Sequence, residues 1–189
     1  ILLYDNELLD EVVISASKFS QKFREVPKKI TQINRSMIDF TNPMTSADLL
    51  ERGGYVYIQK SQLGGGSPMI RGLSTNRLVL SVDGVRLNNA IFRSGNIHNV
   101  ISISPMNIEN SEVIMGSASV LYGSDAIGGV MNFYTKKAKL SNDSNPNIQI
   151  NINSRYSSAS NEKMYHIDFN YGLEKIACLS SFSKSDFDD

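Results

Sequence analysis

Apolar and polar residues alternate with a period of two in the last quarter of the chain, and this feature constrains the fold more than any other. From Ile148 to Tyr156 the apolar positions alternate with Gln, Asn and Arg. From Tyr165 to Tyr171 they alternate with His, Asp and Asn. Alternation of this kind predicts two β-strands, each with one apolar and one polar face. The serine-rich loop 157–162 separates them.

A third segment, 176–183, is less regular, because Ala177 and Leu179 compete with Ile176 and Cys178 for the apolar face. The alternation has two interpretations. In an antiparallel sheet of a soluble protein, one face is packed and the other is solvated. In a transmembrane β-barrel, strands of about ten residues turn apolar side chains to lipid and polar side chains to the lumen. The polar positions here hold amides and charged groups, which adds weight to the barrel.

The residues before a polar linker that begins at Ala138 predict a small α+β unit. The segment Leu78–Leu87 is typical of a β-hairpin, because Asp83-Gly84 favours the positive φ angles of a tight turn. Thr45 or Ser46 is a suitable N-cap for a helix that ends before Gly53. We expect further strands at 12–15, 28–33, 55–58, 112–115 and 130–135, helical turns at 36–40, after 104–105 and at 117–122, and irregular loops at 62–68 and 88–99.

Composition narrows the functional classes. The chain has 189 residues and 41% hydrophobic residues, enough for one folded domain and part of another. Its formal net charge of zero gives no general attraction to nucleic acid, and none is expected as a partner. No apolar run reaches the roughly 18 residues that a membrane-spanning helix needs.

The sequence does not predict an enzyme. Two S-x-x-K patterns, Ser15–Lys18 and Ser181–Lys184, lack a second acylation motif. The glycines 64–66 are not followed by the Gly-Lys-Ser/Thr of a phosphate loop. His98 and His166 are the only histidines and lie in unrelated segments, so neither a zinc site nor a Ser-His-Asp set is predicted. We expect no catalytic residue and no cofactor.

Five segments taken together resemble the plug domain of TonB-dependent outer-membrane receptors. They are D-E-V-V-I-S-A-S (10–17), P-M-I-R-G (68–72), L-V-L-S-V-D-G-V-R-L-N (78–88), S-E-V-I-M-G (111–116) and L-Y-G-S-D-A-I-G-G-V-M-N (121–132). Each is weak alone, but they occur in the order and at the spacing of the family. Within that family the chain looks most like the haem and haemoglobin receptor branch.

The resemblance implies a domain organisation. Residues 1–17 would be an N-terminal lead and TonB box, 18–138 an α+β plug with a small mixed sheet and short helices, and 139–147 a linker. Residues 148–189 would be the first antiparallel strands of a transmembrane β-barrel, which in this family has about 22 strands when complete. Three strands cannot close a barrel, so we expect the chain to be part of a longer protein in the bacterial outer membrane.

The resemblance also implies how the plug packs against the barrel wall. The family usually has Arg-Gly-Pro where this chain has Met115-Gly116-Ser117, and that arginine commonly pairs with barrel carboxylates. Its loss leaves Arg71 as the candidate for such a pair. The expected plug–barrel packing residues are Arg71, Gly123, Asp125, Gly128 and Gly129, with Asp125 capping or bonding to neighbouring backbone rather than binding a ligand.

The implied partners are TonB with its inner-membrane motor, outer-membrane lipids and, as an open alternative, a surface lipoprotein. Residues Asp10, Glu11, Val12, Val13, Ile14, Ser15 and Ala16 correspond to the TonB box. A short β-prone segment at a domain end can add as a strand to the exposed sheet edge of a partner. An ordinary first strand of the plug is the alternative interpretation of the same residues.

The expected function is import of an iron-containing ligand with energy transmitted by TonB. Haem or a haemoprotein is the first expected cargo, because residues 88–100 look most like the plugs of haem receptors. A neutral imidazole is a suitable iron ligand, so His98 is the candidate for one, against the plainer alternative of a histidine bonded to backbone or water. The ligand-contact candidates are Gln62, Asn88, Asn89, Phe92, Arg93, Asn96 and His98. Ferric siderophores and cobalamin are the alternative cargoes, and a signalling or adhesion module that kept the plug fold is the alternative function.

Overall fold

The computed structural model describes residues 12–13, 21–22, 29–62, 65–74, 77–87, 102–116, 119–143 and 145–186. The chain divides into two compact units, the N-terminal unit (residues 1–135) and the C-terminal unit (residues 136–189). No helix within the described ranges is long and apolar enough to cross a membrane.

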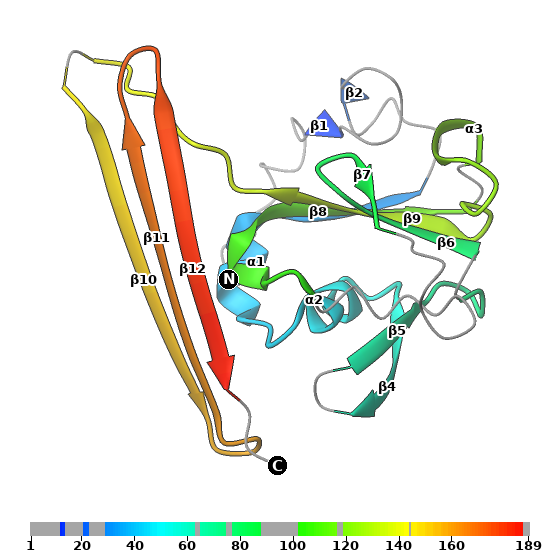
Figure 1. The fold of residues 1–189 in the computed structure, drawn as a ribbon. Coiled ribbons are helices and arrows are strands. Elements are labelled where there is room, and N and C mark those ends of the chain that lie inside the picture. The colour runs from blue at the N-terminus through cyan, green and yellow to red at the C-terminus, as the bar shows by residue number, and fades with distance from the viewer. Residues whose placement is uncertain are drawn as a thin grey trace, which may run out of the picture. The chain divides into compact units, whose positions relative to one another are not determined.

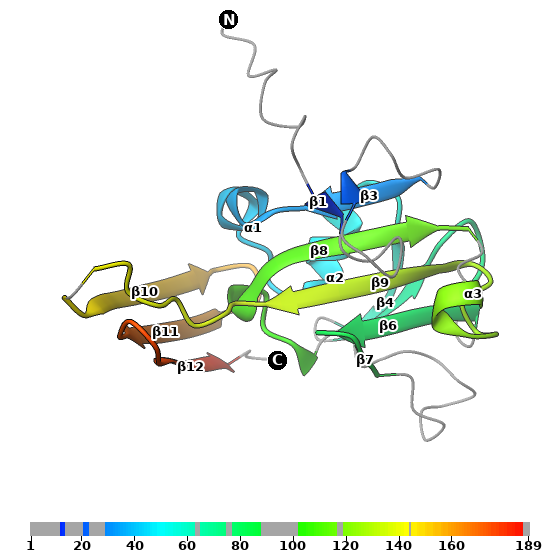
Figure 2. The same cartoon turned by 90° about the horizontal axis from the view of Figure 1, so that it is seen from above.

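A five-stranded mixed sheet organises the N-terminal unit (Figures 1 and 2). Its strands, in spatial order, are β3 (Ile30–Ile33), β8 (Ile108–Met115), β9 (Gly129–Thr135), β6 (Leu78–Val82) and β7 (Val85–Arg86). The β6–β9 pair is parallel and every other pair in this sheet is antiparallel. The predicted hairpin is confirmed, because Asp83 and Gly84 both have positive φ angles between β6 and β7.

Two short helices, α1 (Arg35–Thr41) and α2 (Ser46–Arg52), lie together on one side of this sheet (Figure 1). Thr45 and Asp48 form a capping box at the start of α2, in which each side chain accepts from the backbone N–H of the other. The helices bury Ile38, Leu49 and Leu50 in the main core with sheet residues such as Phe133. The predicted helix boundaries here are confirmed to within one residue.

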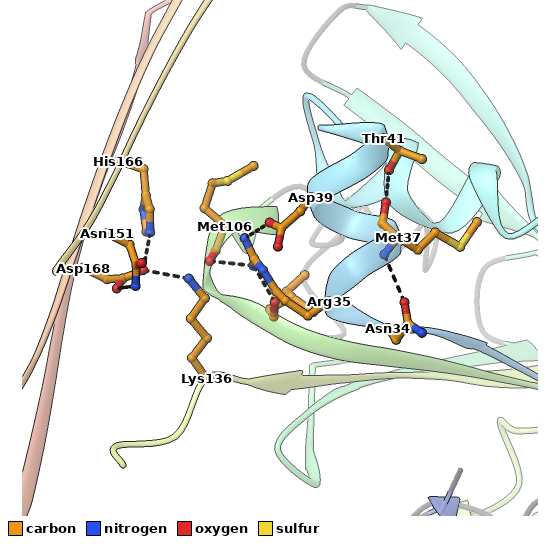
Figure 3. Close-up of polar contacts among 11 residues, drawn as sticks. Asn34, Arg35, Met37, Asp39, Thr41, Met106, Lys136, Asn151, His166 and Asp168 are labelled. Carbon is orange, nitrogen blue, oxygen red and sulfur yellow. Dashed lines mark hydrogen bonds and ion pairs between the residues drawn. The ribbon is translucent and has the colours of Figure 1, made fainter. Parts of the chain in front are cut away.

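Arg35 ties α1 to the start of β8. Its guanidinium donates to the carbonyl oxygens of Met106 at 3.1 Å and Ile108 at 2.8 Å, and it pairs with Asp39 one turn along the helix at 2.5 Å (Figure 3). The segment before β8 is a single 3-10 turn, η5 (Pro105–Asn107), where the sequence predicts a helix start. The opposite side of the sheet carries α3 (Ser119–Tyr122) (Figure 1). Tyr122 of this helix packs against a small second core that includes Ile114, Val79 and Val130.

The predicted irregular loop at 62–68 is wrong. Strands β4 (Tyr57–Gln62) and β5 (Gly65–Met69) form an antiparallel hairpin, with Ile58 opposite Pro68. Pro68 is compatible with this sheet because both strands of a two-stranded sheet are edge strands. On an edge strand, the N–H groups on one side have no strand partner, so a proline can replace one of them. A Cβ at Gly66 would lie 2.5 Å from Cγ2 of Ile58, so this glycine permits close strand packing rather than a turn.

The C-terminal unit is a three-stranded antiparallel sheet of β10 (Asn147–Ser157), β11 (Glu162–Gly172) and β12 (Ala177–Asp186) in chain order. The expected fold class, a mixed α+β unit followed by antiparallel strands, is confirmed. β10 and β11 each have 11 residues, longer than the alternating segments in the sequence, because backbone pairing continues to Asn147–Gly172 at one end and Ser157–Glu162 at the other.

Candidate functional site

In the C-terminal unit the apolar face of the sheet is exposed, and the polar side of its central strand β11 is buried, whereas Gln149, Asn151 and Asn153 on the polar face of β10 are exposed. In a soluble sheet the arrangement is the reverse, with apolar side chains inside. Along β11 the buried residues are Glu162, Met164, His166, Asp168 and Asn170, and the exposed residues between them include Tyr165, Ile167, Phe169 and Tyr171. In β10, Ile148, Ile150 and Ile152 are exposed on the same face, and Ile152 keeps 73% of its surface. Outward apolar residues in strands of this length are the pattern of strands that face lipid.

Strand register decides which residues of β12 share the apolar face. Residues opposite each other in an antiparallel pair point to the same side of a sheet. Cys178 lies opposite Tyr171 and Phe182 lies opposite Ile167, so both join the exposed apolar face. Leu179 lies opposite Asn170 and joins the polar face. Of the alternatives that the sequence leaves open, Cys178 therefore lies on the apolar face and Leu179 does not.

A polar network centred on Asp168 occupies the buried face (Figure 3). One carboxylate oxygen pairs with Lys136 Nζ at 2.7 Å and lies 3.3 Å from His166 Nε2. The other accepts from Asn151 Nδ2 at 2.6 Å. The second imidazole nitrogen of His166, Nδ1, lies 2.6 Å from Ser183 Oγ. A buried carboxylate with this many partners stabilises a unique side-chain arrangement, because removing any one partner leaves an unsatisfied polar group.

Ser183, His166 and Asp168 are thus in contact, a grouping that the sequence analysis did not predict. The His166 side chain is fully buried and the Asp168 carboxylate is shared with Lys136 and Asn151. Within the described ranges, no three His, Cys, Asp or Glu side chains lie close enough to hold a metal ion.

A second buried ion pair lies farther along the same sheet. Arg155 donates from Nε to Glu162 Oε2 at 3.0 Å and from Nη2 to Oε1 at 2.6 Å, and the Glu162 side chain is fully buried. This bidentate geometry is the strongest form of a carboxylate–guanidinium contact. Both charges lie near the 158–161 turn, where they join the ends of β10 and β11.

The glycine-rich stretch after α3 is a tight turn that enters β9. Gly123 has a φ of 91° at the start of the turn. A Cβ at Gly128 would lie 2.9 Å from Leu78 Cδ2, and a Cβ at Gly129 would lie 2.6 Å from the Ile114 carbonyl oxygen. A side chain at Gly128 would require Leu78 to shift, and one at Gly129 would clash with backbone, so these glycines allow β9 to pack closely on β6 and β8. Their packing against a barrel wall stays a prediction.

Two charged residues of the predicted plug–barrel set lie in turns. Asp125 pairs with the Arg86 guanidinium, which joins the glycine-rich turn to β7, and it accepts from Ser124 Oγ at 3.4 Å. Arg71 is exposed and has a φ of 51° in a turn closed by hydrogen bonds between Ile70 and Leu73. Positive φ at both central residues, Arg71 and Gly72, is the signature of a type I′ turn.

The predicted coupling and ligand residues lie largely outside the described residues. Of the coupling segment, the structure describes β1 (Val12–Val13), which pairs antiparallel with β2 (Gln21–Lys22). Gln62 ends β4 opposite Gly65 at the tip of the β4–β5 hairpin. The remaining predicted residues, Asp10, Glu11, Ile14, Ser15, Ala16, Asn88, Asn89, Phe92, Arg93, Asn96 and His98, lie outside the described ranges. Their roles stay predictions.

A row of polar residues across the five-stranded sheet was missed by the sequence analysis. Strand register places Gln32, Glu112, Asn132, Ser81 and Arg86 side by side on five successive strands. Glu112, Asn132 and Ser81 are almost fully buried. Asn132 contacts the Ser81 hydroxyl and donates to the Tyr122 hydroxyl at 3.1 Å. A polar residue inside each apolar strand was the available signal, but the row appears only when register is known.

Asp48 joins the start of α2 to β4. Its carboxylate pairs with Lys60 Nζ at 2.5 Å and accepts from Thr45, beside a cavity of about 250 Å³. Burial raises the pKa of Asp48, but the hydrogen bonds from Lys60 and Thr45 outweigh burial and hold the pKa below its ordinary value. The hydrogen bond to Asp48 likewise raises the pKa of Lys60.

Comparison with known proteins gives a family match over the N-terminal unit. The family described as "TonB-dependent Receptor Plug Domain" matches residues 22–130, more than half of the chain. A vitamin B12 transporter, BtuB, of Vibrio vulnificus is 38% identical over 139 residues, which cover 71% of this chain and 22% of that protein. BtuB of Photobacterium profundum is 32% identical over 132 residues, which cover 69% of this chain and 21% of that protein.

A solved structure resembles both the N-terminal unit and the strands that follow it. The ferripyoverdine receptor of the Pseudomonas aeruginosa outer membrane superposes with a TM-score of 0.73 at 18% identity, over 92% of this chain and 22% of that chain. At this identity the likeness shows the fold alone. The chain spans about a fifth of the length of the curated relatives that it matches.

Proposed function

Because the chain belongs to the TonB-dependent receptor plug domain family, we propose that it forms the plug and the first barrel strands of an active uptake receptor. The family places it in the bacterial outer membrane. In this proposal the N-terminal unit closes the pore, the C-terminal unit begins its wall, and energy from TonB opens the path. The domain boundaries expected from the sequence, 18–138 and 148–189, belong to the same proposal.

The observation that carries the proposal is the inverted sheet of the C-terminal unit. Its apolar residues face outward along 11-residue strands, and its buried face holds the charged groups Asp168, Lys136, Arg155 and Glu162. Water would penalise the first face and lipid would penalise the second. A barrel wall with lipid outside and a plugged polar lumen inside satisfies both faces at once.

Among the residues that the structure describes, β10 and β12 each pair with β11 alone, and in a membrane their outer edges require further strands. Lipid cannot hydrogen-bond an exposed row of backbone N–H and C=O groups. The matched relatives are roughly four to five times as long as the part of them that this chain covers. We therefore infer that additional strands complete the barrel in the whole protein.

For the cargo, we propose a cobalamin or a ferric siderophore, with cobalamin first. Proteins described as vitamin B12 transporters match about 70% of this chain at 32–38% identity, which supports a corrinoid. Likeness in fold to a ferripyoverdine receptor keeps siderophores as the second candidate. The haem expectation rested on residues 88–100, which lie outside the described residues, and no comparison supports it over these two.

The test is ligand binding by the full-length receptor in detergent, measured by calorimetry with cyanocobalamin, ferric pyoverdine and haemin as separate probes. Saturable binding of cyanocobalamin, with uptake of radiolabelled cobalamin in cells, is the expected result. Binding of haemin alone, weakened by His98→Ala, would return the assignment to haem. A receptor that binds a probe but never accumulates it inside cells would favour a signalling module over a transporter.

A further inference from the structure

The connector that leaves β9, residues 136–141, lies along β11 and contacts it at successive positions. Lys136 Nζ pairs with Asp168 Oδ2 at 2.7 Å. Two residues farther along β11, Asn170 accepts from the Lys139 backbone N–H at 2.8 Å and donates to the Lys139 carbonyl at 3.1 Å. The connector therefore runs in the same direction as β11, with its backbone held at Lys139 by the Asn170 side-chain amide.

Two further contacts continue this docking. The Ser141 backbone N–H donates to the Leu173 carbonyl at 3.1 Å, and Asn147 donates from its side chain to the Leu140 carbonyl at 3.1 Å. Gly172 leaves room for the connector, because a Cβ there would lie 2.1 Å from the Lys139 carbonyl oxygen. The connector is thus held from both β11 and β10.

Asp168, Asn170 and Gly172 occupy alternate positions of β11 and so share one face of the sheet. This is the buried polar face, and Asp168 and Asn170 are 2% and 4% exposed. Asp168 forms an ion pair with Lys136, and farther along β11 the two-point amide contact of Asn170 and the missing side chain of Gly172 both meet Lys139. Together these three residues fit the connector: Asp168 pairs with a lysine side chain, Asn170 binds a peptide N–H and C=O, and Gly172 leaves room for a carbonyl oxygen.

The chain on the other side of the joint is held by the N-terminal unit. The Asp83 carboxylate accepts from the Thr135 backbone N–H at 2.9 Å and from its hydroxyl at 2.6 Å. We call these two hydrogen bonds the Asp83 clamp. Thr135 is followed directly by Lys136, so the Asp83 clamp and the Lys136–Asp168 ion pair hold neighbouring residues. The Asp83 clamp is exposed, whereas the Asp168 and Asn170 contacts are part-buried.

We propose that residues 136–141 are a fixed anchor of the C-terminal unit, and that any rearrangement of the plug ends at Thr135 and opens the Asp83 clamp first. An exposed hydrogen bond exchanges readily with water, so opening it costs little. Releasing Asn170 leaves a buried amide without partners, and releasing Asp168 from Lys136 leaves a buried charge, which both cost more. The two clamps therefore differ in strength, and the weaker one lies on the plug side.

Native-state hydrogen exchange of the full-length receptor in lipid vesicles tests this, with increasing urea and neither ligand nor TonB. The expected result is that the amides of Lys139 and Ser141 exchange with the urea dependence of β11 amides, while β9 amides exchange at lower urea. Connector amides that exchange together with those of β9 would overturn the proposal. Because no ligand or partner is needed, this result is independent of the proposed transport function.

Variants separate the two clamps. Asn170→Ala is expected to raise the exchange rate of the Lys139 amide by about tenfold or more, from the loss of two hydrogen bonds. Gln149→Ala is the matched control, since Gln149 lies directly opposite Asn170 in register on the same face, and it is expected to leave that amide unchanged. Asp83→Ala should speed exchange at Thr135 and leave Lys139 as it was. Equal effects of the Asn170 and Gln149 variants, or acceleration at Lys139 in the Asp83 variant, would contradict the anchor.

Discussion

Replacing Ile152 by arginine tests whether the exposed apolar face meets lipid. Ile152 is the sixth of 11 residues in β10, and its partner Ile167 is the sixth of 11 in β11, so both lie at the middle of the strands. An arginine at the midplane of the lipid-facing side of a barrel costs about 2–4 kcal/mol. The same change on a water-exposed surface stays within about 0.5 kcal/mol.

The expected cost corresponds to a roughly 30- to 700-fold fall in the folding equilibrium constant. The measurement is urea-dependent folding of the full-length receptor into vesicles, followed by the shift in gel mobility between folded and unfolded forms. Asn153→Arg is the matched control, because Asn153 is the next residue, on the polar face opposite His166. We expect this control to cost much less. An Ile152→Arg cost below about 0.5 kcal/mol, or equal to that of the control, would refute the lipid-facing assignment.

Three further predictions concern the plug. Deleting residues 11–15 should abolish energised uptake and leave ligand binding intact in a cell-surface binding assay, and loss of both would remove the coupling role. Asp48→Asn should cost about 1 kcal/mol near neutral pH through the capping box. The pKa of Asp48 is lowered in the folded state, so its contribution to stability is present above the ordinary aspartate pKa and is lost as pH falls through the folded pKa. Wild type and variant should therefore unfold at the same urea concentration at acidic pH. A stability difference that persists at acidic pH would contradict this. Gly129→Ala should cost about 1–3 kcal/mol in the same urea melts, because its Cβ would lie 2.6 Å from the Ile114 carbonyl oxygen. Gly54→Ala is the control: its Cβ would meet nothing within 4 Å, so it should cost only the strain of its positive φ. Equal costs for the two variants would show that the close contact at Gly129 does not matter.

Short-range signals predicted most of the secondary structure. The N-cap at Thr45, the Asp83-Gly84 turn and the alternation in β10 and β11 each involve residues a few positions apart, and all three are confirmed. The error at 62–68 has the same origin. Three glycines and a proline indicate a loop when read locally, but Gly66 is needed because Ile58 packs against it from the neighbouring strand.

The candidate site could be predicted only in part. The resemblance identified the glycine-rich turn and the first strands of a barrel, because these are contiguous motifs. The polar row from Gln32 to Arg86 joins residues from five strands, and the contact of Ser183, His166 and Asp168 joins two strands. Such groupings depend on register, and a shift of one residue would send every side chain to the other face.

The sequence by itself determined that the last quarter of the chain forms strands with one apolar and one polar face, because a period of two is a local property of the backbone. It also determined where the main turns and helix caps lie. Only the tertiary structure decided that the polar side of β11 is the buried one, that Cys178 rather than Leu179 faces outward, and that the connector docks on Asp168 and Asn170. These features arise from hydrogen bonds between residues far apart in the chain, whose partners the local pattern does not specify.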